Sequence, residues 1–389
     1  MKKNESKFEL NGDYYSTRFE PLNSETGDTL IINMGPQHPS THGVLRIVVE
    51  LDGEYIKKAE PVLGYIHRMH EKMGEVKTYM QYLPNMGRVD YLHALAWNWA
   101  YVGAVEKLTG IEVPQRAEYI RVITCELNRI CSHLLWWGAY LLDLGAFTPI
   151  LYAFVDREKI MDILQMVTGS RLTYCYYRFG GVSADITDEF INQTKEFLAY
   201  FKTRIPMYHD LVTGNMILRG RCEDIGVLSI ETAKEYGATG PVIRGSGLPY
   251  DVRSVEPYSV YNQFDFEIPV GKNGDAMDRY DVRVAEMTES IKIIEQALES
   301  MPDGHFINPN LPDRIMPPKG EAYFAVEGAR GKIGIYVISD GTAKPYRIKL
   351  RAPGFSNLHV FAELAQGTLL SDAVSILGSL DLVIPEIDR

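Results

Sequence analysis

The sequence predicts an α+β protein, in which a central bundle of long helices is combined with small β elements near the two ends of the chain. Three observations predict this class. Apolar residues recur at helical spacing through the middle of the chain, β-branched runs bounded by turn residues occur near both ends, and glycine and proline interrupt the helical pattern over residues 220–280. We therefore expect a polar lead-in, an N-terminal β-rich domain, a helical bundle domain that contains the irregular insertion, and a C-terminal β/α segment packed back on the bundle. These parts cover residues 1–28, 29–66, 67–320 and 321–389.

In the N-terminal β-rich domain, residues 29–34 and 44–52 are expected to form strands, with residues 55–63 as a further candidate. The loop between the first two strands contains two prolines, which fix φ, and two glycines, which permit tight turns. Such a stiff loop would aim the side chain of His42 from its tip. Seen alone, a loop histidine of this kind can equally well do no more than bond to the loop backbone.

The helical bundle domain begins where the spacing of apolar residues changes to that of a helix. We predict helices over residues 69–83, 89–108, 114–144, 149–168, 187–211 and 281–300. The third of these has Pro114 in its first turn, and Thr187 is a suitable N-cap for the fifth. Long helices joined by short loops are typical of a bundle.

The C-terminal segment is expected to form a small sheet followed by short helices. The predicted strands are residues 322–327, 332–339 and 346–351, and the predicted helices are residues 358–365 and 371–377. The last twelve residues, 378–389, are largely apolar, so we expect them to be tucked into the fold.

The composition excludes several classes of function. The net charge of −11 and the isoelectric point near 5.4 argue against a nucleic-acid partner, because such proteins usually carry a basic surface. The longest apolar run, residues 134–142, is much shorter than the ~20 residues that a membrane-spanning helix needs. The first residues lack the apolar segment of a secretory signal, so we expect a chain that stays in the cytoplasm.

Four cysteines, at positions 125, 131, 175 and 222, form no Cys-x-x-Cys pair. Neither a zinc ribbon nor an iron-sulfur cluster can be built from them alone. Sequence motifs for dinucleotide or phosphate binding, for a serine nucleophile and for a zinc protease are also missing. We therefore expect this chain to hold no metal or other cofactor by itself.

Five residues stand out as candidates for chemistry. His67 and His70 are expected on one face of the first helix, but no third metal ligand is visible nearby, so a polar helix start is favoured over a metal site. Tyr91 is expected at the start of the second helix, where the alternative is a core tyrosine. Asp143 ends the apolar run and needs a partner if it is buried. Together with His42, Tyr91 and Asp143 could form a proton-delivery set, in which the aspartate orients the histidine and the tyrosine bonds to a carbonyl oxygen.

Several motifs together resemble one family. The segment from Gly35 to Arg46 and four further runs are similar to the quinone-site D-type subunits of proton-pumping NADH-quinone oxidoreductase, respiratory complex I; the other runs are residues 67–72, 88–91, 178–182 and 381–389. The resemblance covers residues 29–389. It implies the fold of the large subunit of nickel-iron hydrogenases, whose two Cys-x-x-Cys pairs are missing here. By this resemblance, the former metal cavity is the headgroup end of a quinone tunnel.

The resemblance also implies roles for particular residues. His42 and Tyr91 match the residues that hydrogen-bond the two quinone carbonyls, and Asp143 matches the partner of His42. Asp381 and Val383 match residues that line the same cavity.

Three further residues match positions that face an iron-sulfur cluster in a partner subunit. Arg68 and Arg88 would supply fixed positive charge there, which favours the reduced state of the cluster. Thr173 stands where many relatives have a histidine. Because threonine does not titrate near neutral pH, coupling of the cluster potential to protonation through this position is put in doubt.

Taken as a whole, the resemblance implies a catalytic subunit that is active only within a complex on the cytoplasmic face of the inner (plasma) membrane, as a peripheral protein. Its partners would be the B-type iron-sulfur subunit, which holds a tetranuclear cluster, the C-type and other peripheral-arm subunits, and membrane-arm subunits at the tunnel mouth, with quinone as the substrate. Two alternatives remain. One is the large subunit of an energy-converting hydrogenase, or a relative that takes electrons from ferredoxin or a deazaflavin. The other is a structural scaffold that tolerates substitution of His42, Tyr91 and Asp143.

Overall fold

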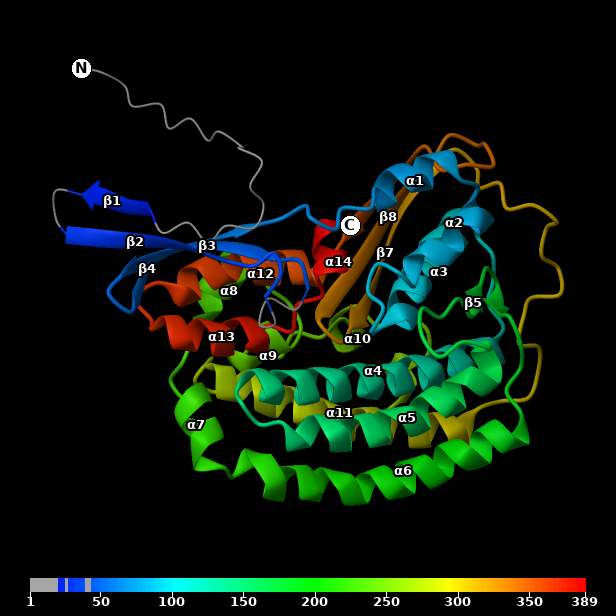
Figure 1. Cartoon of the computed structure of the whole chain (residues 1–389). Helices are drawn as coiled ribbons and strands as arrows, with labels where there is room; N and C mark the ends of the chain where they lie inside the picture. Colours follow the sequence, from blue (N-terminus) through cyan, green and yellow to red (C-terminus); the bar gives the residue numbers. More distant parts are fainter. Residues whose placement is uncertain (1–19, 25–26, 39–42) are drawn as a thin grey trace.

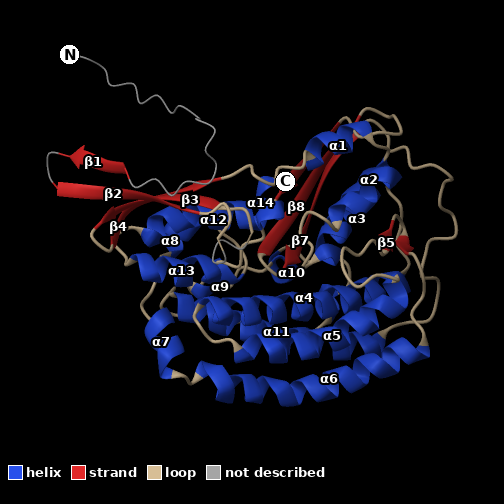
Figure 2. Cartoon of the chain, viewed as in Figure 1, coloured by secondary structure: helices blue, strands red, loops and turns tan. Residues whose placement is uncertain are grey.

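The computed structural model describes residues 20–24, 27–38 and 43–389 (Figure 1). His42 lies outside the described residues. Long helices stacked side by side form one half of the molecule, and two small sheets lie over them (Figure 2). This mixture of helix and sheet confirms the predicted α+β class.

Five helices form the bundle. They are α3 (Ala94–Thr109), α4 (Gln115–Asp143), α5 (Thr148–Thr168), α6 (Asp188–Tyr208) and α11 (Ala276–Ser300). Helix α4 contacts α3, α5 and α11, and most of its side chains are buried. The cap predicted for the fifth helix is confirmed, because the Thr187 side chain accepts a hydrogen bond from the amide of Phe190. Helix α11 begins earlier than predicted, since Asp275 rather than a later residue caps it.

The two helices predicted before α4 differ from expectation. Residues 69–83 were expected to form one helix, but the structure has α1 (His70–Val76) and α2 (Tyr79–Met86). The break occurs because Thr78 and Gln81 form a capping box that starts a new helix. Helix α3 was expected from residue 89 but begins at Ala94.

The N-terminal sheet has four antiparallel strands in sequence order: β1 (Glu20–Ser24), β2 (Gly27–Met34), β3 (Arg46–Asp52) and β4 (Tyr55–Val62). Strand β1 lies within the expected polar lead-in, where no strand was predicted. Alternate residues of β3, Ile47 and Val49 among them, are buried in a core shared with the C-terminal helices.

The irregular region before α11 contains short helices rather than bare loops. These are α7 (Met216–Cys222), α8 (Ile230–Glu235), α9 (Pro241–Gly245) and α10 (Val252–Val255). Before it, β5 (Tyr177–Arg178) and β6 (Gly181–Val182) form a two-stranded ribbon. Gly240 has φ 72° and lies so close to Arg330 that a Cβ atom would be 2.5 Å from its carbonyl oxygen. The insertion is thereby packed against the C-terminal sheet.

The C-terminal segment has the strands and the two helices predicted for it, and it also has a last short helix that was not predicted. The strands β7 (Gly320–Gly328), β8 (Gly331–Ser339) and β9 (Arg347–Arg351) are antiparallel, and α12 (Pro353–Ala365), α13 (Leu370–Ser379) and α14 (Ile384–Asp388) follow. The tail is tucked in as expected, since Ile384 and Ile387 are buried. In the view of Figure 1, α14 lies between the two sheets. The last residue, Arg389, accepts a hydrogen bond from the amide of Arg68, so the tail contacts the chain just before α1.

Candidate functional site

Three of the predicted site residues, Arg68, Arg88 and Thr173, lie together. The Arg68 guanidinium donates to the carbonyl oxygen of Arg88, and burial and the charge of Arg88 lower the pKa of Arg68. Gly87 packs against the turn that contains Thr173, where a Cβ atom would be 2.6 Å from the carbonyl oxygen of Tyr174. Arg88 itself is exposed. The structure thus brings residues from three separate segments to one positively charged surface.

Tyr91 is adjacent to this surface in the chain. It lies in the turn before α3 and not on the helix as predicted, because the Asp90 side chain accepts hydrogen bonds from the amides of Leu92 and His93 and holds a turn there. Its side chain is 37% exposed, so it is not a core tyrosine in this chain. Partial burial and the negative charge of Asp90 raise the pKa of Tyr91.

A buried ionic cluster lies beside Tyr91. Arg330, in the turn between β7 and β8, donates from Nη1 to Asp90 Oδ2 at 2.8 Å and from Nη2 to Asp381 Oδ1 at 3.2 Å. Asp381 and Val383, predicted to line a cavity, are both buried and lie just before the start of α14. The charges of Arg330 and Asp381 also affect the pKa of Tyr91, so Tyr91 and Asp381 lie in the same region of the structure.

Asp143 is placed differently from the prediction. It was expected as a buried carboxylate within the bundle, but it is the last residue of α4 and is half-buried. The helix ends there, which gives the side chain access to solvent. A Cβ atom on Gly378 would lie 3.7 Å from Asp143 Oδ2, so Asp143 is next to the C-terminal end of α13. Because His42 is outside the described residues, the predicted pair stays a prediction.

The two histidines near α1 do not share a helical face, so that expectation is wrong. The helix begins at His70, and Met69 before it has φ 54°, which turns His67 away from the helical path. His67 Nδ1 lies 2.7 Å from the carbonyl oxygen of Asp388, whereas His70 is buried and burial lowers its pKa to about 4. Within the described ranges, no group of three or more metal-ligating side chains is found.

Sequence reasoning missed Arg330 and a larger network of buried charges behind it. Arg244 bonds to Glu286 and Glu327, and Glu286 also bonds to His133 Nε2 at 2.9 Å. The network adjoins the cluster at Arg283, whose Nε is 3.9 Å from Asp381 Oδ2. A signal was present in the sequence. Titratable residues recur every three or four positions on two long helices, at Glu126, Arg129 and His133 of α4 and Arg279, Arg283 and Glu286 of α11.

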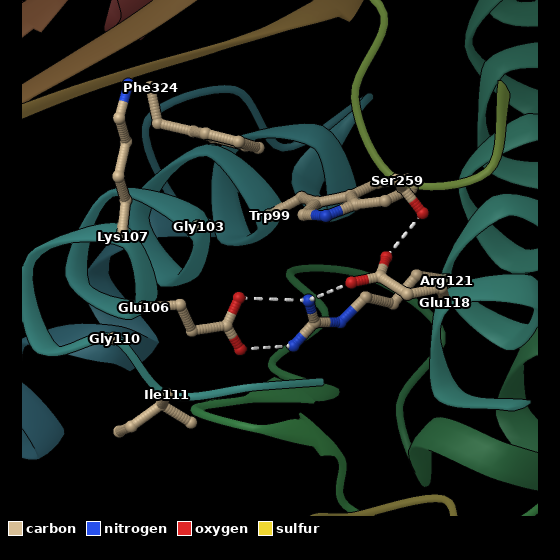
Figure 3. Close-up of a pocket in the computed structure, with 10 residues that line it drawn as sticks. All are labelled: Trp99, Gly103, Glu106, Lys107, Gly110, Ile111, Glu118, Arg121, Ser259 and Phe324. Carbon is tan, nitrogen blue, oxygen red and sulfur yellow. Dashed lines mark hydrogen bonds and ion pairs between the residues drawn. The ribbon is translucent and has the colours of Figure 1, made fainter. Parts of the chain in front are cut away.

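A separate cavity of about 360 Å³ lies at the other end of α3 (Figure 3). Arg121 is held there between Glu106, at 2.7 Å, and Glu118, at 3.6 Å. Sixteen residues of helix, about 24 Å, separate this end of α3 from the turn that holds Tyr91. The cavity contains none of the predicted site residues.

The comparisons with known proteins agree with the resemblance. The chain matches the model for the 49 kDa subunit of respiratory-chain NADH dehydrogenase over residues 143–317 and 310–389. It is 58% identical to the D-type subunit of NADH-quinone oxidoreductase from Syntrophobacter fumaroxidans, over 92% of this chain and 96% of the relative. It is 47% identical to the D-type subunit from Bacillus cytotoxicus, over 93% of this chain and 99% of the relative. The chain therefore belongs to this family of respiratory complex I subunits. Among the helices of the described ranges, none has the length and apolarity that are needed to cross a membrane.

Proposed function

We propose that this chain binds the quinone headgroup in a proton-translocating NADH-quinone oxidoreductase and supplies protons while the quinone is reduced. The observation that carries the proposal is the position of Tyr91. The side chain of Tyr91 is partly exposed. In the sequence it closely follows Arg88, which belongs to the Arg68–Arg88 surface, and in space the buried Asp90–Arg330–Asp381 cluster lies beside it. The relatives are named as subunits of NADH-quinone oxidoreductase, which supports the same conclusion.

In this proposal, quinone reduction requires two electrons and two protons. Tyr91 and His42 hydrogen-bond the two quinone carbonyls and are proton donors, and Asp143 pairs with His42. Asp381 and Val383 form part of the wall behind the headgroup. The raised pKa of Tyr91 keeps its phenol protonated at neutral pH, as a proton donor must be.

Electrons reach the quinone from a tetranuclear iron-sulfur cluster held by the B-type partner subunit, which we place against Arg68, Arg88 and Thr173. The two arginines supply positive charge that stabilises added electrons. The exposed guanidinium of Arg88 is available to such a partner. Other partners are the C-type subunit, further peripheral-arm subunits and the membrane-arm subunits at the tunnel mouth. Within the complex, this chain lies on the cytoplasmic face of the inner (plasma) membrane as a peripheral protein.

The test compares wild type with Tyr91→Phe in membranes. We expect NADH-quinone reduction to fall about 10²-fold or more, the usual contribution of a positioned proton donor. NADH oxidation by a hydrophilic acceptor, which draws electrons upstream of the quinone, should be unchanged. Tyr236→Phe is the matched control, because Tyr236 is also 37% exposed and lies outside the proposed site. Unchanged quinone reduction by Tyr91→Phe would contradict the proposal and favour a scaffold role.

A further inference from the structure

We propose that Arg157 of α5 is a docking residue, which pairs with a carboxylate side chain of the subunit that packs on the turn containing Thr173. In the proposed function that subunit is the partner holding the iron-sulfur cluster, so this inference rests on the proposed function and deepens it. No sequence motif pointed to Arg157. It is suggested by a buried guanidinium that has no anionic partner in the part of the chain described.

Arg157 is buried, and the groups around its guanidinium are neutral. Only 7% of the residue is exposed. Its Nη1 lies 2.7 Å from the sulfur of Met161, one helical turn further along α5, and a thioether is a weak acceptor without charge. The Cys131 thiol of α4 is a second neighbour, and burial raises the pKa of that thiol to about 11, so it is neutral at pH 7. The Arg157 Nε is buried and has no hydrogen-bond partner among the described residues.

The other buried arginines of the described chain all donate to oxygen atoms. Arg330 and Arg244, for example, pair with carboxylates. Even Arg279, which has no ion pair within the described ranges, donates to one hydroxyl and two carbonyl oxygens. Arg157 has neither kind of partner among these residues, although buried charges are normally paired because an unpaired one is costly. An anion supplied from outside them would remove that cost.

The acids next to Arg157 in the chain are already paired with other arginines. Asp156 Oδ2 is 2.9 Å from Arg204 Nε of α6, and Glu158 is paired with Arg171. The Glu158 side chain is also 54% exposed, so water screens its charge. Neither acid forms an ion pair with Arg157. The missing carboxylate is therefore not supplied by the nearest residues of this helix.

Arg157 lies where a subunit packed on the turn containing Thr173 can reach it. Arg171, two residues before Thr173, pairs with Glu158 and so fastens this turn to the part of α5 that contains Arg157. The Phe154 ring centre is 5.7 Å from the Arg157 guanidinium carbon, and Phe154 is 38% exposed, so the surface is close on this side. A guanidinium binds carboxylates strongly, and arginines and aromatic residues often dominate the binding energy of interfaces. The chemistry therefore selects an aspartate or glutamate of the partner.

The first measurement is thermal unfolding of the full-length chain alone. Arg157→Met removes the charge and keeps much of the length of the side chain. We expect an unchanged or higher Tm, because the substitution removes an uncompensated buried charge and leaves no acid unpaired. Arg204→Met is the matched control, and it should lower the Tm because it leaves Asp156 buried without its cation. A clear fall of the Tm in Arg157→Met would mean that the acid belongs to this chain, and the inference would be wrong.

The second measurement is the rate at which the iron-sulfur subunit leaves the assembled complex, when the complex is immobilised through a tag on this chain. In Arg157→Met we expect release to be about 30-fold faster or more, since loss of one member of a buried charge pair at an interface has an effect of this size on dissociation. Arg157→Lys keeps the charge and should release the subunit more slowly than Arg157→Met. Arg204→Met should behave like wild type. Unchanged release in Arg157→Met contradicts the inference.

Arg157→Lys also identifies the acid. A carbodiimide joins an amine and an adjacent carboxylate as an amide, so the new amine should be linked to an aspartate or glutamate of the iron-sulfur subunit, which peptide mapping locates. A link to an acid of this chain or of another subunit, or no link, would overturn the inference.

The two proposals fail separately. If release and linkage contradict the role of Arg157 while Tyr91→Phe abolishes quinone reduction, the inference is wrong and the proposed function stands. If Tyr91→Phe has no effect, the proposed function fails, and release and linkage still decide the role of Arg157 because neither requires quinone reduction.

Discussion

Arg330→Met tests the ionic cluster beside Tyr91 most directly, because methionine has a similar length and no charge. The substitution leaves Asp90 and Asp381 buried without the cation that now lies 2.8 Å and 3.2 Å from them. Breaking a buried ion pair by removal of one partner costs about 3–5 kcal/mol. Asp90 keeps its two backbone hydrogen bonds, and Arg283 stays near Asp381, so we do not expect a larger loss.

The loss can be measured as the free energy of urea-induced unfolding of the full-length chain. The four tryptophans are all buried, so their fluorescence reports unfolding. The loss should be smaller at about pH 5 than at neutral pH, because the two orphaned carboxylates can take up protons. The double variant Arg330→Met/Asp90→Asn should recover part of it, since one uncompensated charge is gone.

Arg171→Met is the matched control, because Arg171 also pairs with two acids, Glu158 and Asp162, but on the surface. Its effect should be much smaller, since exposed pairs contribute little. The reasoning about a buried, charge-sensitive cluster is refuted if the two arginine variants unfold alike. It is also refuted if the loss in Arg330→Met does not depend on pH.

Three further predictions concern the surface around α1 and α2. Gly87→Ala should lower the free energy of unfolding by about 1–3 kcal/mol, because the new Cβ would lie 2.6 Å from the Tyr174 carbonyl oxygen. Thermal unfolding measures this loss. Gly214→Ala is the control and should be neutral, since no atom lies within 4 Å of its Cβ position. Between pH 6.5 and about 4, His70 is neutral in the folded chain but protonated in the unfolded chain, so the free energy of unfolding should fall by up to about 3 kcal/mol as the pH falls through this range. In His70→Gln, the free energy of unfolding should depend less on pH in this range. Thr173→His should make the reduction potential of the partner's cluster depend on pH in the assembled complex, and a potentiometric titration that stays pH-independent would contradict the proposed placement of that cluster.

The helices that could be predicted well are those whose limits are set by neighbouring residues. Helix α5 matches its prediction closely, and α6 begins where the Thr187 cap was expected. The break at Thr78 was missed although its capping box is also local, because the apolar spacing continues across it. Strand β1 could not be predicted in the same way. Its polar sequence forms a strand because it pairs with β2, which is a tertiary contact.

In the candidate site, too, the features that depend on local sequence could be predicted and those that depend on distant contacts could not. Arg68 and Arg88 were found through motifs and do lie together, but Arg330 carries no local signal of its role. It sits in a hairpin turn, and its partner Asp90 is 240 positions away in the sequence. Whether a charged residue is buried depends on such a distant partner, since an unpaired charge could not remain there. Helix α4 ends at Asp143, close to its predicted end, but the apolar run before Asp143 suggested more burial than its half-buried side chain has.

The C-terminal tail explains how distant segments are combined into one neighbourhood. Asp381 reaches Arg330, Glu386 reaches the start of α12, and Asp388 accepts hydrogen bonds from the backbone just before α1. These contacts tie the turn after β7, the α12 start and the Arg68 segment to one short stretch of chain. A tail held only for stability would need apolar side chains, such as Ile384 and Ile387, which it also has. Its three acids add buried charge at a cost, and that cost is compatible with a site in which charge and protons change during turnover.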